Sequence, residues 1–279
     1  MQGDNHDACV RKVLAGQSRR AIGGSAVKGV FLEDLTWPEA KARFAAGAVV
    51  VMPIGAAAKE HGFHLPLGAD YLTARELGRR VAEHLPVVVA PVVGFGFYPA
   101  FTAYPGSQHL KAETFIALAT ELIENLIDHG VTRIAVINTG VSTEAPLRIV
   151  SGDILARRGV RIAVVDMRLL GRAADSVLRQ QGGGHADERE TSVMLAIKPD
   201  AVRMDLARRA EDAPAAPSPV GFARSTRLSP DPTPGMLHSP TGATGDPTLA
   251  TREKGERILE EMTRELVDGI RALFPDVVR

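Results

Sequence analysis

The sequence lacks several features that would assign it to well-known protein classes. It contains a single cysteine, Cys9, in 279 residues, so an internal disulfide and a zinc site built from several thiolates are both excluded. Lys and Arg number 33, as do Asp and Glu, and this zero balance argues against a nucleic-acid-binding protein. No dinucleotide-binding glycine motif or Walker loop occurs, so a nucleotide cofactor is unsupported. A metal site would need oxygen and imidazole ligands, which makes the eight histidines the residues to follow.

Long apolar runs are also missing. No stretch of about 18 apolar residues could form a membrane helix. The first 30 residues contain no apolar core of the kind that a secretory signal needs. We therefore predict a cytoplasmic protein without a membrane partner, in which residues 1–30 form a flexible tail.

From residue 31 onward, apolar strands alternate with amphipathic helices. Thr36 and Glu39 form the pattern of a helix capping box. The predicted strands cover residues 48–54, 86–93, 133–138 and 161–167, and the predicted helices cover residues 36–46, 71–84, 112–129, 145–158, 191–197 and 252–273. This alternation indicates one α/β domain over residues 31–279, with a mainly parallel sheet covered on both faces. The loops that follow the strands are expected to converge at one edge of the sheet.

One segment interrupts this alternation of strands and helices. Residues 211–240 are rich in proline and poor in large apolar side chains, which predicts a long surface excursion rather than a domain linker. It would act as a lid, form an oligomer contact or have no order at all.

The loop after the first predicted strand concentrates potential metal ligands. Glu60, His61, His64 and Asp70 fall within the segment EHGFHLPLGAD. Imidazole and carboxylate groups together bind Zn, Mn or Fe, and parallel α/β sheets bind ligands at the ends of their strands. The alternative is a polar loop whose histidines cap helices or bond to backbone groups. The density of these residues at a strand end favours a metal site.

A second cluster lies in the segment GGGHADERETS, residues 182–192. Its three glycines permit close approach of the backbone, and His185 and Glu188 follow directly. These two residues are candidates for the functional site. Glu190 is a further catalytic candidate, although an acidic residue near the start of a helix is also favoured by the helix dipole.

These blocks resemble the creatininase (creatinine amidohydrolase) family. The resemblance also rests on LEDLTWPEA at residues 32–40, YPGS at 104–107 and GDPTLATREKG at 245–255. It implies a three-layer α/β/α fold, a commonly hexameric homo-oligomer, and a two-metal site that activates water to cleave or open a C–N bond.

The resemblance also assigns roles to individual residues. His61 matches a metal ligand, and Asp70 matches the aspartate that bridges the metals. Glu188 matches an acidic residue that is a ligand in many members. His185 matches a histidine that handles substrate and transfers protons.

The chain departs from the family pattern at two positions. The family usually has Glu two residues before the first histidine, whereas this chain has Lys59 there and Glu60 beside it, so we assign the ligand role to Glu60. After the third strand, Gly140 stands where the family has a histidine ligand. Three outcomes follow from that loss: a single retained metal, a substitute ligand, or a site without hydrolase activity. The candidate substitutes or pocket residues are His64, Tyr98, Glu144 and His238.

The function predicted from these observations is metal-dependent hydrolysis. A divalent ion, Zn or Mn in one or two copies, would activate water for attack on a C–N bond of a small amide-type molecule other than a peptide. His185 would move the proton to the leaving nitrogen. The alternative from another class is a non-catalytic scaffold or small-molecule binding protein with a degenerate metal site.

Overall fold

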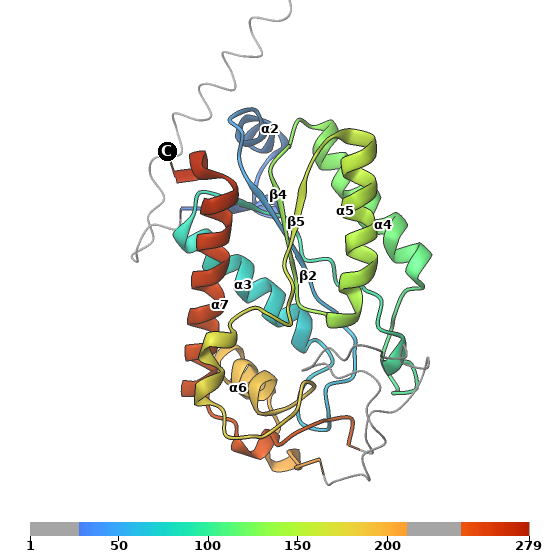
Figure 1. The fold of residues 1–279 in the computed structure, drawn as a ribbon, viewed down its shortest axis with the longest axis vertical. Coiled ribbons are helices and arrows are strands. Elements are labelled where there is room, and N and C mark those ends of the chain that lie inside the picture. Colours follow the sequence, from blue (N-terminus) through green and yellow to red (C-terminus); the bar gives the residue numbers. More distant parts are fainter. Residues whose placement is uncertain (1–27, 211–240, 279) are drawn as a thin grey trace, which may run out of the picture.

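The computed structural model describes residues 28–210 and 241–278, which form a five-stranded parallel sheet with helices on both faces (Figure 1). The strand order across the sheet is β1-β3-β2-β4-β5. The strands are β1 (Val30–Phe31), β2 (Val50–Ile54), β3 (Val88–Val89), β4 (Ile134–Asn138) and β5 (Ile162–Val164). The helices are α2 (Trp37–Ala45), α3 (Ala69–His84), α4 (Ala112–Asp128), α5 (Glu144–Arg158), α6 (Glu188–Ile197) and α7 (Arg252–Leu273).

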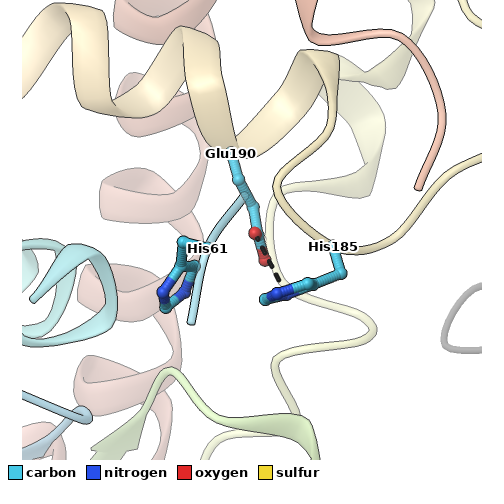
Figure 2. A group of neighbouring side chains, drawn as sticks. All are labelled: His61, His185 and Glu190. Carbon is cyan, nitrogen blue, oxygen red and sulfur yellow. Dashed lines mark ion pairs between the residues drawn. The ribbon is translucent and has the colours of Figure 1, made fainter. Parts of the chain in front are cut away.

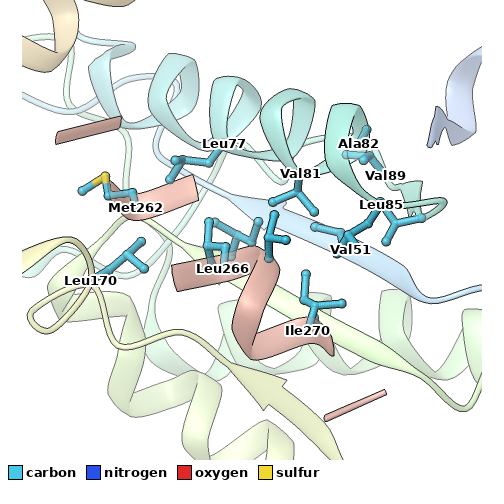
Figure 3. Packing of buried hydrophobic residues seen from close by; sticks show 14 of the residues in the cluster. Val51, Leu77, Val81, Ala82, Leu85, Val89, Leu170, Met262, Leu266 and Ile270 are labelled. Atoms are coloured by element: carbon cyan, nitrogen blue, oxygen red, sulfur yellow. The ribbon is translucent and has the colours of Figure 1, made fainter. Parts of the chain in front are cut away.

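Each face of the sheet carries its own hydrophobic core. Successive side chains of a strand point to opposite faces, so Val51 packs toward α3, α6 and α7 while its neighbours Val50 and Met52 pack toward α4 and α5. Figure 3 shows the first core, in which Leu77 of α3 and Leu266 of α7 lie close to the strand. Every residue of β2 is buried, which explains why the strand reads as a continuous apolar run.

The predicted mainly parallel α/β fold is confirmed, including the six helices. The backbone N–H of Thr36 donates to the Glu39 carboxylate at 2.7 Å, as the capping box at the start of α2 predicts. The short strand β1 was not predicted, and it places Val30 in the sheet. Residues 1–27 of the predicted tail and the whole 211–240 excursion, with His238, lie outside the described residues. No helix within the described ranges is both long and apolar enough to cross a membrane.

The order of the strands determines where a site can form. From β2 the chain passes to β3 on one side, and it later returns to β4 on the other side of β2. Parallel sheets open a crevice at such a switch point, outside the carboxyl ends of the two central strands. The loops after β2, β3 and β4 line one pocket there, which confirms their predicted convergence.

Candidate active site

Three potential metal ligands meet at the switch point. The ligand atoms of His61, His185 and Glu190 all lie within 4.8 Å of one another. His61 comes from the loop after β2, His185 from the glycine-rich loop before α6, and Glu190 from the first turn of α6. Figure 2 shows the Glu190 side chain descending from its helix between the two imidazoles. The centroids of the two imidazole rings are 5.0 Å apart.

The start of α6 fixes the positions of two of these ligands. Asp187 is the N-cap, and its carboxylate accepts hydrogen bonds from the backbone N–H groups of Arg189 and Glu190 at 2.9 and 3.0 Å. Its second oxygen accepts the N–H of Gly184 at 2.8 Å. One side chain therefore holds both the glycine-rich loop and the first turn of the helix.

Ala186, which lies between the glycine-rich loop and the first turn of α6, has a φ of 47°. This left-handed conformation costs a residue with a Cβ about 1–2 kcal/mol. It allows the Ala186 N–H to donate to the Glu190 carboxylate at 2.7 Å, which fixes that side chain. The backbone of His185 is held as well, because its N–H donates to the Thr244 hydroxyl at 3.0 Å and its carbonyl accepts the Thr244 N–H at 2.8 Å.

His61 faces Asp70 across 3.0 Å, from Nε2 to Oδ1. The other ring nitrogen, Nδ1, donates to the carbonyl of Lys59 at 2.9 Å. With Nδ1 protonated, a neutral ring would place two acceptors, Nε2 and Oδ1, side by side, and these require a shared cation. Burial lowers the pKa of His61, but the Asp70 carboxylate outweighs that effect, so the pKa is raised and a proton shared with Asp70 is favoured.

The second oxygen of Asp70 faces a buried lysine. The Lys59 ammonium lies 2.7 Å from Oδ2, and both side chains are 8% exposed. Burial raises the pKa of Asp70, but Lys59 and then His61 outweigh it, so the pKa of this carboxyl lies below its usual range. Burial likewise lowers the pKa of Lys59, and Asp70 reverses the direction, so the lysine stays charged.

Glu60 contacts His185 but does not belong to the cluster of His61, His185 and Glu190. Its carboxylate accepts a hydrogen bond from His185 Nε2 at 3.0 Å, and it also accepts the N–H of Gly62. Nδ1 of His185 then faces Glu190 at 3.7 Å. A carboxylate that binds one imidazole nitrogen fixes the tautomer and the orientation of the ring.

Burial raises the pKa of Glu190 to about 7, with a further contribution from Asp187 that His61 opposes. A carboxyl group with a pKa near 7 can accept and release a proton at physiological pH. It can equally serve as an anionic ligand once a cation is present.

The remaining predicted residues lie outside the cluster. The fully buried Glu188 accepts N–H groups from residues 179 and 180 at 2.8 and 2.7 Å, and it forms an ion pair with Lys254. His64 bonds to the hydroxyl of Thr191 at 2.8 Å. Glu144 pairs with Arg168 at 2.8 Å. Each of these groups is thus engaged by another partner in the structure.

A pocket of about 480 Å³ gives access to the cluster. Its polar wall contains Lys59, Asp70, His185 and Glu190, whereas Tyr98 and Phe101 are apolar parts of the wall. The Tyr98 hydroxyl donates to the carbonyl of residue 58 at 3.1 Å. A second pocket of about 860 Å³ adjoins the first, and the two share residues 141, 184 and 190.

Lys59 lines the pocket although the sequence marks it only as a departure from the family pattern. Its position gave a signal, because the lysine stands two residues before His61 in the loop that follows the buried strand β2. The sequence did not show that the Lys59 side chain points into the pocket, because a lysine in a loop is ordinarily solvated.

Comparison with known proteins gives a consistent result. A family model described as creatininase, creatinine amidohydrolase, matches residues 33–270. The creatinine amidohydrolase of Pseudomonas putida is 32% identical over 269 residues, covering 89% of this chain and 98% of that protein. The mycofactocin precursor peptide peptidase of Mycolicibacterium smegmatis is 31% identical over 245 residues, covering 82% of this chain and 86% of that protein.

Solved structures show the same similarity. A structure described as creatininase with Mn superposes with a TM-score of 0.69 at 28% identity, covering 89% of this chain and all (100%) of that one. A mutant creatininase described as a Zn-Zn type has a TM-score of 0.67 at 28% identity, with coverage of 89% and 99%.

Proposed function

This chain belongs to the creatininase family of hydrolases, and from that premise we propose that it is a metal-dependent amidohydrolase that cleaves a C–N bond. The observation that carries the proposal is the meeting of His61, His185 and Glu190 beside Asp70, at the switch point of the sheet. Solved relatives are described as Mn and Zn forms, and nitrogen and oxygen ligands suit both metals.

The residues present fit a divalent ion. Nε2 of His61 and Oδ1 of Asp70 lie 3.0 Å apart, so a divalent ion that displaced the proton between them would find an imidazole nitrogen and a carboxylate oxygen side by side. An ion that lies about 2.0–2.2 Å from each ligand atom holds neighbouring ligand atoms roughly 3 Å apart. We propose His61 and Glu190 of the cluster as ligands, and Asp70 as a third because it contacts His61 and matches the family's metal-binding aspartate.

When bound, such an ion lowers the pKa of water and polarises a carbonyl group. The chain supplies the proton transfer. His185 lines the pocket and its Nε2–H is held by Glu60, so its Nδ1 can accept the proton of the attacking water and deliver it to the leaving nitrogen. Glu60 is therefore proposed as the residue that positions His185, rather than as a ligand.

The similar Pseudomonas protein is a creatinine amidohydrolase, which favours a compact amide such as a cyclic amide or a formamide. The zero net charge also favours a small substrate over a charged polymer, because no overall field would steer the polymer. A peptide is the second candidate. A second pocket adjoins the first, and the similar Mycolicibacterium protein is a precursor peptide peptidase.

The test is a turnover assay on protein loaded with Zn or Mn. The panel consists of creatinine, other cyclic amides, formamides and short peptides, with products identified by mass spectrometry. Turnover that disappears in a His185→Gln protein supports the proposal. Bound metal without turnover of any amide, or no metal at all, favours a non-catalytic scaffold or binding protein.

A homo-oligomeric assembly, a hexamer by family resemblance, and a cytoplasmic location are parts of the same proposal. Light scattering coupled to gel filtration measures the assembly state directly. A monomer at micromolar concentration would contradict the expected assembly.

A further inference from the structure

Lys59 is buried beside the proposed ligand Asp70, and its role rests on the proposed metal-dependent function. A lysine that is 7% exposed, in the wall of a pocket that holds His185 and Glu190, is an unusual residue to bury. Its ammonium lies 2.7 Å from Asp70 Oδ2 and 4.9 Å from the centroid of the Phe101 ring. The carboxylate and the aromatic face both stabilise a fixed positive charge at this point.

Asp70 consequently has a cationic partner on each oxygen. Oδ1 faces Nε2 of His61, where the proposed ion binds, and Oδ2 faces the ammonium. A carboxylate that bridges two metal ions uses one oxygen for each ion. In this chain, the second of those positions is taken by the lysine.

The segment at the end of β4 adds no charged ligand to the pocket. The described residues of this segment that line it are all neutral: Asn138, Thr139, Gly140, Val141, Ser142 and Thr143. The carboxylates that directly follow Lys59 and Thr143 in the sequence already have partners. Glu60 binds His185, and Glu144 binds Arg168. A Cβ on Gly140 would lie 3.1 Å from the Thr143 hydroxyl, so the local backbone leaves little space for a larger side chain.

We propose that the Lys59 ammonium takes the place of a second divalent ion, so that this site holds one ion, on the His61 side of Asp70. A dication on the Oδ2 side would have to displace the ammonium from its carboxylate while being repelled by it. One similar solved protein is described as a Zn-Zn type, so the ion count is a difference that an experiment can detect.

The first measurement is the number of ions per chain. Metal-free protein is reloaded with excess Zn, passed through a desalting column and analysed by mass spectrometry for zinc and protein. One ion per chain in the wild type is the expected result. Two ions per chain would overturn the inference and leave the proposed function intact, whereas no bound ion would overturn both.

The second measurement is the Zn affinity, by competition with a chromophoric chelator. Lys59→Met removes the charge but keeps most of the chain length, and we expect it to tighten Zn binding by at least about tenfold. Lys59→Arg keeps the charge and is expected to stay within about threefold of the wild type. Lys41→Met, which removes an exposed lysine from α2, is the matched control and should change nothing.

An unchanged affinity in Lys59→Met would overturn the role given to the ammonium. If that variant does not fold, the ion count of the wild type still decides the question.

Discussion

His61 and Asp70, nine residues apart in the chain, face each other with 3.0 Å between Nε2 and Oδ1. The loop between β2 and α3 folds back to make this contact, because Asp70 lies in the first turn of α3 while His61 lies in the loop before it. A shared cation is the natural partner of both atoms, and the first prediction follows from that.

Asp70→Asn is expected to abolish stoichiometric Zn binding. The amide is a much weaker ligand than the carboxylate, and it leaves the buried Lys59 without its counter-ion, which costs about 3–5 kcal/mol of stability. Elemental analysis of the desalted protein measures the ion, and urea unfolding measures the stability. The exposed Asp200→Asn variant is the control. Full metal occupancy in Asp70→Asn would refute the ligand assignment.

Substitutions of His185 and of Glu190 are expected to separate metal binding from catalysis. Glu190→Gln should lose the ion, since a neutral amide replaces a ligand. His185→Gln should keep the ion and lose about 10²–10⁴-fold in kcat, the usual worth of a positioned proton-transfer group. Metal content and turnover are measured on the same samples. If His185→Gln also loses its metal, the histidine is a ligand and the proton carrier must be another group.

Glu188→Gln is expected to weaken the fold while sparing the metal. The carboxylate is fully buried, binds two backbone N–H groups and pairs with Lys254, so neutralising it leaves the lysine without a partner. We expect a loss of about 2–4 kcal/mol in the free energy of unfolding. The reverse pattern, with normal stability and a lost ion, would show that Glu188 is a ligand.

Asp187→Ala and Thr36→Ala form a pair of helix-cap variants. Each removes an N-cap side chain and should lower stability by about 1 kcal/mol, within a range of about 0.5–2. Asp187 also holds the turn that carries His185 and Glu190, whereas Thr36 lies at the start of α2. Zn affinity should therefore fall only in Asp187→Ala. Equal affinities in the two variants would mean that the cap does not position the ligands.

The buried His64 predicts a loss of stability in acid. Burial lowers its pKa to about 4, helped by the nearby His61, whereas in the unfolded chain the pKa is about 6.5. The unfolded state therefore takes up the proton first as the pH falls. The stabilisation is present above pH 6.5 and is lost between pH 6.5 and 4.

The size of that loss is roughly 2 kcal/mol after allowance for solvent screening. Urea unfolding of metal-free protein at a series of pH values measures it. His64→Gln can keep a hydrogen bond to Thr191 but does not titrate, so its stability should fall less steeply. Parallel curves for the two proteins would rule out this role of His64.

The fold could be predicted from the sequence because its strands are buried on both faces. Runs such as residues 48–54 stay apolar over their whole length, and the helices between them show a clear period. Strand β1 was missed because two residues carry no period. It exists through its pairing with Val88 and Val89, a contact between distant segments.

The site could be predicted only to the level of its loops. His61, Asp70, His185 and Glu190 do meet, since strand ends converge on one edge of the sheet. The sequence does not show which of two nearby polar residues points its side chain into the cluster. Glu188 and Glu190 are two residues apart on a helix, hence separated by about 200°, so only one of them can face the cluster. The same ambiguity applies to Lys59 and Glu60 in the preceding loop.

The paired hydrogen bonds between His185 and Thr244 bear on how molecules enter and leave. Because these bonds tie the segment before α7 to the glycine-rich loop, a movement of that loop would have to break both of them or carry residue 244 along. The two pockets join at Val141, Gly184 and Glu190, directly beside this tie, so the shape of their junction is coupled to the position of His185.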